Sequence, residues 1–231
     1  MPVRSLGYVH LDVGDVDEWE VFARDFMGLM PTTSPLDASR YFRMDHFPSR
    51  FAIHPADEPR CAALGFEVLD RTELAELAAR IADEGIDVAT GTPEQCAARQ
   101  VTGLISFTDP GGNPIEVFYG PILDHVPPVT PLVSGFVTGA QGMGHAIVSV
   151  GDDAAPAYDF YTRVLGMFER NSMRVGDSEL FFLGCNERHH TLGVMPMPGP
   201  GRLIHLMIEV ADLDDVGRAL DRSEQLEVPL M

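Results

Sequence analysis

Two stretches of the chain share a pattern in which a short strand-like run is followed by apolar residues at helical spacing. Residues 6–15 read LGYVHLDVGD and residues 143–152 read MGHAIVSVGD, and both runs end in Gly-Asp. After the first run, Trp19, Phe22 and Phe26 lie three to four positions apart, and a similar pattern follows the second run. This spacing puts the apolar side chains on one helix face. The sequence therefore predicts a strand–helix unit at each place.

The two predicted helices also share their end signals. Gly28 and Gly166 each follow the last apolar residue of the helical pattern, and each precedes an apolar pair. Glycine readily adopts the left-handed conformation that ends helices. Asp152 or Asp153 is expected to cap the second helix, with Pro156 in its first turn. The two units thus agree in their ends as well as in their apolar faces.

A second pair of similar stretches lies at a constant offset of 142 residues. Residues 65–74 read GFEVLDRTEL and residues 207–216 read MIEVADLDDV, and each continues into a helical pattern. Residues 103–119 add a predicted hairpin, because two strand-like runs flank an Asp-Pro-Gly-Gly-Asn turn. The chain is therefore predicted to contain four related modules. They run near residues 5–57, 62–120, 142–198 and from 202 onward.

These modules predict an α+β fold built from paired βαβββ units. The first two modules form a predicted N-terminal domain, residues 1–123, and the last two form a C-terminal domain, residues 142–231. The proline-rich run DHVPPVTP predicts a linker over residues 124–141. The fourth module stops at Met231, before a counterpart of the second module's hairpin. We therefore expect a truncated last module with exposed strand edges, and a chain of this length that is poorly stable and inactive.

Composition and charge narrow the classes of function. An apolar content of 45% and a charged content of 22% are typical of globular proteins. The sequence has neither an apolar run of the roughly 18 residues needed to span a membrane nor a signal peptide, so we expect a cytoplasmic protein. The net charge of −19 argues against nucleic acids and anionic membranes as partners. Cys61, Cys96 and Cys185 form no Cys-x-x-Cys pair, so neither a disulfide framework nor a zinc–thiolate site is expected.

Two histidines occupy matching positions in the paired modules of the second half. His145 begins the first strand of the third module, and His205 begins the first strand of the fourth. Matching positions in paired modules are related by pseudo-symmetry, so the two side chains should lie close together. Two neutral imidazoles placed in this way suit a divalent transition metal. The pattern therefore predicts that His145 and His205 are ligands of one metal ion.

The repeat also predicts where a third ligand belongs. Glu116 lies in the last strand of the second module, and adding the offset of 142 gives position 258, which is 27 residues beyond Met231. A carboxylate there completes a two-histidine, one-carboxylate face with open positions, as in non-haem Fe(II) oxygenases. Glu209 shares a strand face with His205 but lies about 13 Å along the strand. It is therefore too far away to bind the same ion.

The N-terminal half does not repeat the full ligand set. The two histidine positions are filled by Tyr8 and Ala63, and only Glu116 matches a ligand position. A single donor does not hold a metal ion, so we interpret this half as a scaffold. His10 and His54 fall outside the ligand positions and are expected to have structural or surface roles.

Two adjacent histidines, His189 and His190, end a strand-like run. Adjacent side chains on a strand point to opposite faces, so only one of the two can face a metal. Histidine titrates near neutral pH and can carry a proton beside a metal ion. The alternative is that the pair ends a loop without a functional role. The residues alone leave both interpretations open.

Three motifs together resemble a known family. They are GHAIV at residues 144–148, FFLGCNERHHT at 181–191 and LIHLMIEV at 203–210. These motifs resemble the type I extradiol catechol dioxygenases of the vicinal oxygen chelate superfamily, whose fold is glyoxalase-like. The resemblance covers all 231 residues, including the half without metal ligands. It is nearest to enzymes that cleave bicyclic or polycyclic catechols, such as dihydroxybiphenyl and steroid-catechol dioxygenases.

The resemblance implies roles for individual residues. It makes His145 and His205 ligands of Fe(II), with Mn(II) as the alternative metal, and it places the third ligand, a glutamate, beyond Met231. It makes His190 the active-site acid/base. The implied pocket residues are Phe182 and Met173 on the substrate side and Ile147 on the dioxygen side.

The implied reaction inserts O₂ into a catechol ring next to the diol, and the implied assembly is a homo-oligomer, often an octamer. Three alternatives remain open at this point. One is a glyoxalase- or epimerase-like metalloenzyme on the same scaffold, although such enzymes usually lack the His-His-Thr stretch. Another is a metal-free protein that binds small molecules. The last is an inactive fragment.

Overall fold

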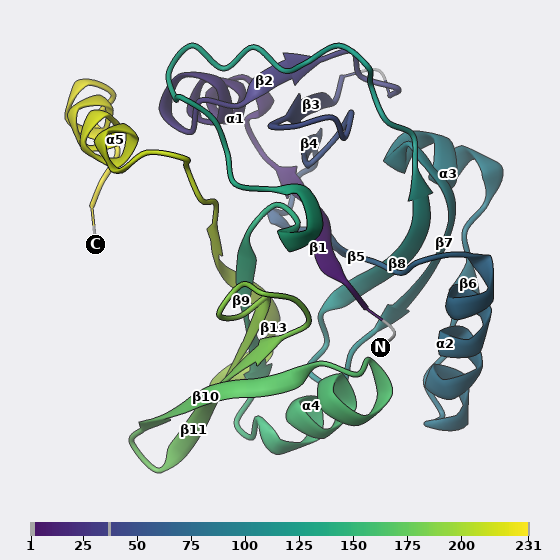
Figure 1. Ribbon diagram of the computed structural model, residues 1–231. Helices are drawn as coiled ribbons and strands as arrows, with labels where there is room; N and C mark the ends of the chain where they lie inside the picture. Colours follow the sequence, from purple (N-terminus) through teal and green to yellow (C-terminus); the bar gives the residue numbers. More distant parts are fainter. Residues whose placement is uncertain (1–2, 37, 231) are drawn as a thin grey trace.

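The computed structural model describes residues 3–36 and 38–230. Two sheets, one from each half of the chain, lie next to each other with helices packed against them (Figure 1). The N-terminal elements are β1 (Ser5–Val13), α1 (Val16–Val21), η1 (Phe22–Phe26), β2 (Met30–Thr32), β3 (Arg40–Arg43), β4 (Phe51–Pro55), β5 (Arg60–Glu67), α2 (Arg71–Asp83), β6 (Ala89–Thr90), α3 (Pro93–Arg99), β7 (Val101–Thr108) and β8 (Pro114–Pro121). The C-terminal elements are η2 (Gly139–Gln141), β9 (His145–Gly151), α4 (Ala155–Asp159), η3 (Phe160–Val164), β10 (Phe168–Val175), β11 (Ser178–Gly184), β12 (Leu192–Met195), β13 (Met197–Met207) and α5 (Leu213–Gln225).

Both halves use the same strand pairing, which confirms the predicted α+β fold of paired βαβββ units. In the N-terminal half, β1 runs parallel to β4 and antiparallel to β5, and the other edge of β5 carries the parallel strand β8. In the C-terminal half, β9 runs parallel to β12 and antiparallel to β13. The predicted hairpin of the second module is present as β7 and β8.

The register between the two central strands is also the same in both halves. Tyr8 on β1 lies opposite Gly65 on β5. His145 on β9 lies opposite Met207 on β13. Gly65 and Met207 differ by the offset of 142 that the sequence repeat predicts. Tyr8 therefore occupies the structural position of His145.

The first helix of each half departs from the predicted α-helix. Both helices continue as a π-helical turn, in which the Met27 amide donates to the Phe22 carbonyl at 3.0 Å and the Leu165 amide donates to the Phe160 carbonyl at 3.2 Å. A π-turn adds one residue per turn. The extra residue lets neighbouring side chains, Phe160 and Tyr161, both be buried. The apolar spacing in the sequence predicts a helix but does not distinguish a π-turn from a regular α-helical turn.

The predicted helix ends are correct in part. Gly28 and Gly166 have positive φ angles of 77° and 73°, as their stop role requires. The N-cap of α4, however, is Ala154 and not Asp152 or Asp153. The Asp153 carboxylate instead accepts a hydrogen bond from the Ala155 amide at 2.9 Å. Asp153, one residue before the N-cap, thus provides the acceptor for a backbone N–H group of the first helical turn.

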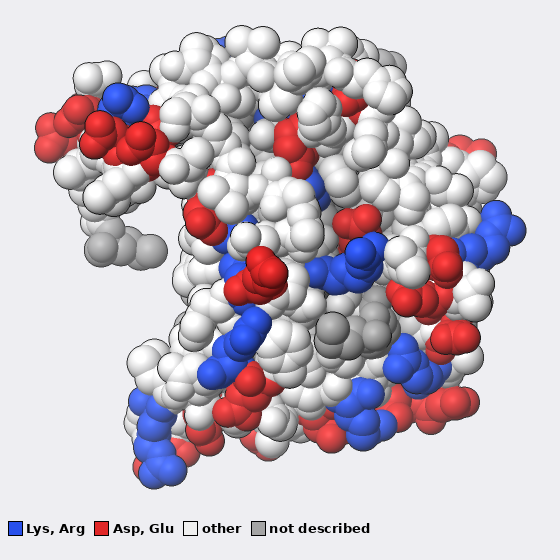
Figure 2. Space-filling model, viewed as in Figure 1, with Lys and Arg blue, Asp and Glu red and all other residues white. Residues whose placement is uncertain are grey.

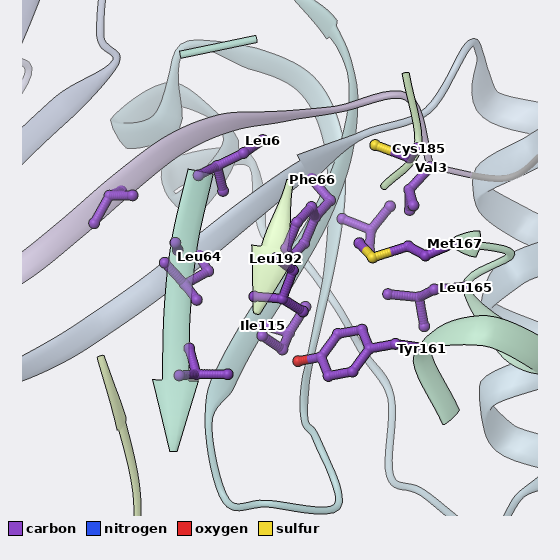
Figure 3. Close-up of a cluster of buried hydrophobic side chains, with 14 of the residues drawn as sticks. Val3, Leu6, Leu64, Phe66, Ile115, Tyr161, Leu165, Met167, Cys185 and Leu192 are labelled. Carbon is purple, nitrogen blue, oxygen red and sulfur yellow. The ribbon is translucent and has the colours of Figure 1, made fainter. Parts of the chain in front are cut away.

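Figure 3 shows that side chains from both halves meet in one hydrophobic core. Leu6, Phe66 and Ile115 come from the N-terminal sheet, and Tyr161 and Leu192 come from the C-terminal half. Each of the five is at most 1% exposed. Burial of a side chain of this size contributes about 1.5–3 kcal/mol. The two predicted domains thus share a core, while their boundaries stay a prediction.

The turn between β7 and β8 inserts into the C-terminal half. The buried Asp109 carboxylate accepts hydrogen bonds from the Asn113 amide and from the Tyr161 hydroxyl, both at 2.7 Å. The Asn113 side chain donates to the Ser149 carbonyl at 3.0 Å. An added Cβ at Gly111 would lie 2.8 Å from a Cα atom of β9, so backbone packs on backbone here. Burial raises the pKa of the Asp109 carboxyl, because desolvation disfavours its charged form.

Helix α5 stands apart from the C-terminal sheet and lies near η1 (Figure 1). The Arg222 side chain donates to the Phe26 carbonyl at 3.1 Å. A groove of about 920 Å³ separates α5, η1 and β13, which is the last strand of its sheet in the described part of the chain. Leu213, Val216 and Leu220 on α5 are 82%, 53% and 49% exposed, and Figure 2 shows acidic side chains over the same helix. Helix α5 thus exposes apolar side chains, while the expected truncation of the last module and its effect on stability stay predictions.

Two smaller expectations also meet the structure. Cys61, Cys96 and Cys185 are free thiols, as predicted. Within residues 3–36 and 38–230, no helix combines the length and the apolar character that a membrane crossing needs.

Candidate active site

One face of the C-terminal sheet gathers the predicted site residues. Alternate residues of a strand share a face, so His145 and Ile147 on β9 point the same way. His205 on β13 lies opposite Ile147 and joins them. The residues between them, Ala146 and Val148, belong to the hydrophobic core on the other face. The strand alternation thus separates a chemical face from a packing face.

The two predicted metal ligands meet at their ring nitrogens. The Nε2 atoms of His145 and His205 lie 3.1 Å apart. Two nitrogens that each lie about 2.1 Å from one ion, with roughly 90–100° between the bonds, are about 3.0–3.2 Å apart. The pair therefore fits two adjacent positions on one metal ion. Within the described ranges, no group of three or more His, Cys, Asp or Glu forms a metal site, and the expected glutamate beyond Met231 lies outside them.

Partial desolvation favours the neutral form of these imidazoles at physiological pH; His145 is buried, whereas His205 is more exposed. Desolvation, followed by the neighbouring His190 and His205, lowers the pKa of His145 to about 3. Desolvation also lowers the pKa of His205. For His190, desolvation and then His189 lower the pKa to about 4. Only the deprotonated ring binds a cation, so the pair is in the state that a metal requires.

His190 lies directly beside the ligand pair. Its ring is stacked on His145 with 3.8 Å between ring centroids, and Phe182 packs edge-on against it at 4.8 Å. Its Nε2 atom is buried and has no hydrogen-bond partner within the described ranges. Its Nδ1 atom lies 3.0 Å from Nδ1 of His189, which is exposed. The structure thus places His190 at the site and His189 toward solvent.

Arg188 fixes the loop that carries the two histidines, and the sequence analysis missed it. Its buried guanidinium pairs with the Glu209 carboxylate and donates to the Val137 carbonyl at 3.1 Å. Glu209 is therefore engaged by an arginine, which agrees with its exclusion as a metal ligand. In the sequence, Arg188 directly precedes the His-His pair and Glu209 follows His205 by four residues. Neither position indicates that the two side chains form an ion pair.

The remaining predicted pocket residues lie at different depths. Ile147 is buried and covers Gly193, where an added Cβ would lie 2.3 Å from the Ile147 Cδ1 atom. Met173 lies on β10, further out on the hairpin than Phe182, and is 50% exposed. Ile147 and Phe182 are therefore close to the histidines, while Met173 lies at the rim. Their roles stay predictions.

The matching face of the N-terminal half holds a buried polar network. The Tyr8 hydroxyl donates to the Glu116 carboxylate at 2.5 Å, and Arg99 donates to both Glu116 oxygens at 2.8 and 2.9 Å. Beside them, Nδ1 of His10 lies 2.8 Å from Nε2 of His54. This arrangement agrees with the structural roles expected for His10 and His54.

This network predicts a loss of stability in mild acid. Desolvation, followed by the Arg99 charge, lowers the pKa of both His10 and His54. Since an unfolded histidine has a pKa of about 6.5, the unfolded chain binds these protons first. Stability that is present above that pH is lost as the pH falls toward the folded pKa values. We expect the thermal midpoint, followed by circular dichroism, to fall between about pH 6.5 and pH 5.

The double variant His10→Gln/His54→Gln tests this prediction. The control is His125→Gln, which changes an exposed histidine. The double variant should show a weaker pH dependence in the same window, although His145 and His190 still contribute. An unchanged pH dependence in the double variant would contradict the assignment.

Comparison with known proteins identifies the family. The family model described as dihydroxybiphenyl dioxygenase BphC D1 matches residues 6–56, and that of the glyoxalase/bleomycin resistance protein/dioxygenase superfamily matches residues 142–231. The chain is 39% identical to an iron-dependent extradiol dioxygenase of Rhodococcus jostii (strain RHA1), with 100% of this chain and 80% of the relative covered. It is 42% identical to a biphenyl-2,3-diol 1,2-dioxygenase of Metapseudomonas furukawaii, with 96% and 75% covered.

A solved structure shows the same relationship. The crystal structure of BphC, a halotolerant catechol dioxygenase, matches with a TM-score of 0.93 at 35% sequence identity, covering 99% of this chain and 77% of that one. The similarity thus extends over both sheets and includes the face that carries the histidine pair. The chain belongs to the type I extradiol ring-cleaving dioxygenases of the vicinal oxygen chelate superfamily.

Proposed function

We propose that this extradiol dioxygenase cleaves a bicyclic or polycyclic catechol next to its diol, with O₂ and with Fe(II) held by His145 and His205. The observation that carries the proposal is the 3.1 Å contact between the two Nε2 atoms, with His190 stacked beside it. The names of the two relatives, one iron-dependent and one acting on biphenyl-2,3-diol, support the metal and the substrate class. Mn(II) is the alternative metal.

The chain's own residues supply the other parts of the reaction. His145 and His205 would hold the metal, which would supply a Lewis-acid centre for the catechol and dioxygen. Nε2 of His190, which has no hydrogen-bond partner among the described residues, takes a proton from a substrate hydroxyl and returns it as the ring opens. Phe182 and Ile147 provide apolar walls that exclude water. Met173 contacts the distal ring of a larger substrate at the rim.

A ring-cleavage assay tests this proposal. The protein, as its natural gene encodes it, is loaded with Fe(II) under anaerobic conditions. It is then mixed with biphenyl-2,3-diol under air. We expect a yellow ring-opened product, and slower conversion of unsubstituted catechol because it leaves the apolar walls unfilled. If no member of a panel of one- to three-ring catechols is opened, the proposal is wrong. The names of the relatives favour ring cleavage over the activity of a glyoxalase-like enzyme or the role of a metal-free binding protein. The expected homo-oligomeric state and cytoplasmic location stay predictions.

The proton-transfer role predicts a specific defect for His190→Phe. Phenylalanine keeps a ring stacked on His145 but removes the acid/base, which is worth about 100- to 10,000-fold in rate. We expect metal content, measured by plasma mass spectrometry, to be unchanged while turnover falls by this factor. The surface variant His125→Phe serves as the control and should behave like the wild type. Loss of metal from His190→Phe would instead make His190 a ligand.

A further inference from the structure

The loop between β11 and β12 is anchored on both sides of its two histidines. Arg188, on one side, is buried and pairs with the Glu209 carboxylate. Thr191, on the other side, is also buried, and its amide donates to a main-chain carbonyl of β11 at 2.8 Å. The backbone that carries His189 and His190 is therefore fixed at both ends.

Within this loop the two imidazoles meet each other. Their Nδ1 atoms lie 3.0 Å apart, and the planes of the two rings are 89° apart. Because the residues lie in a loop, their side chains are not forced to opposite faces as they are on a strand. Nε2 of His190 is buried at the site and has no hydrogen-bond partner within the described ranges, whereas the side chain of His189 is exposed. The contact with His189 is thus the one hydrogen bond that the His190 ring makes to the described residues.

A hydrogen bond between two Nδ1 atoms has a direction. A neutral imidazole carries one proton, so one of its ring nitrogens donates and the other accepts. For His190 to take a proton at Nε2, its own proton must lie on Nδ1. That Nδ1–H group then donates to Nδ1 of His189, and the proton of His189 lies on its Nε2 atom, where water accepts it. The opposite direction puts an N–H group at the buried Nε2 of His190, which then cannot take a proton from the substrate.

We infer that His189 is a positioning residue, which accepts the Nδ1–H group of His190 and so keeps Nε2 of His190 free to act as the base. The inference rests on the proposed role of His190 and adds a partner to it. In a histidine, the hydrogen bond made by one ring nitrogen sets which nitrogen carries the proton. An acceptor behind a catalytic imidazole fixes its tautomer and its orientation. His189 supplies this acceptor from the solvent side of the site.

Two variants of the same shape separate this role from packing. Asparagine has an oxygen and leucine a methyl group where histidine has Nδ1, so His189→Asn keeps an acceptor and His189→Leu removes it. The side chain is exposed, so both variants should give the circular dichroism spectrum of the wild type. With Fe(II) bound and biphenyl-2,3-diol as the substrate, kcat of His189→Leu should fall about 10-fold at unchanged metal content. His189→Asn should stay close to the wild type. An equal loss in both variants, or no loss in His189→Leu, would overturn the inference.

The tautomer itself is measured without metal or substrate. Magic-angle-spinning nitrogen NMR of protein labelled in its histidine rings separates protonated from unprotonated ring nitrogens, and the His190 signals are those that His190→Phe lacks. In the metal-free wild type and in His189→Asn, the His190 proton should lie on Nδ1, and in His189→Leu it should move toward Nε2. A wild-type His190 with its proton on Nε2 shows that the inference is wrong. Because this measurement needs no turnover, its result is distinct from a failure of the proposed function.

Discussion

Replacing either His145 or His205 with alanine is expected to remove the metal from the C-terminal half and to slow catechol cleavage by more than about 100-fold. Loss of an outer-shell partner already costs about 10- to 100-fold in metal affinity or activity, so loss of a direct ligand costs more. Each variant removes one of the two nitrogens that lie 3.1 Å apart. The remaining imidazole is then a single donor, which binds a divalent ion weakly.

The metal content and the cleavage rate of both variants are compared with those of His125→Ala, whose side chain is exposed in the linker. The control should keep the metal and the activity of the wild type. Circular dichroism of the metal-free proteins should show the same secondary structure in all cases, because His145 and His205 lie on the face of the sheet opposite the hydrophobic core. Full metal content in either site variant would exclude that histidine as a ligand.

The Asp109→Ala variant is expected to lower the free energy of unfolding by about 3 kcal/mol, because it leaves two buried donors without an acceptor. These donors are the Asn113 amide and the Tyr161 hydroxyl, and Tyr161 comes from the other half of the chain. For a chain of this size, this change lowers the thermal midpoint by about 6–12 °C. Scanning calorimetry measures the midpoint and shows whether the two halves unfold together.

A matched control is Asp57→Ala, at an exposed loop position of the N-terminal half. It should change the midpoint by no more than about 1–2 °C, in line with ordinary surface substitutions. Because Asp109 joins the two halves, its loss is also expected to broaden the transition. A midpoint equal to that of Asp57→Ala would mean that the buried turn does not stabilise the contact between the halves.

The parts of the fold that repeat could be predicted from the sequence. The Gly-Asp strand ends and the offset of 142 give the module order, and the matching register of Tyr8 and His145 follows from that order. The π-turn at Phe160–Val164 could not be predicted, because it depends on how Phe160 and Tyr161 pack in the core. Local periodicity does not carry that information.

The histidine pair could be proposed from the sequence because its two members occupy matching positions in a repeat. The arginine contacts could not, because a guanidinium reaches a carboxylate that is far away in sequence. Arg99 lies 17 residues from Glu116, and Arg188 lies 21 residues from Glu209. Such pairs are set by how strands and loops come together in space. The insertion of Asp109 next to Tyr161, 52 residues further on, is a contact of the same kind.

The central claim is that His145 and His205 bind the catalytic metal, and a crystallographic experiment tests it most directly. Crystals of the metal-loaded protein are measured on both sides of the metal's X-ray absorption edge. The account predicts one strong anomalous peak in the C-terminal half, about 2.1 Å from Nε2 of each of the two histidines. A peak bound elsewhere, with these two imidazoles free, would contradict it.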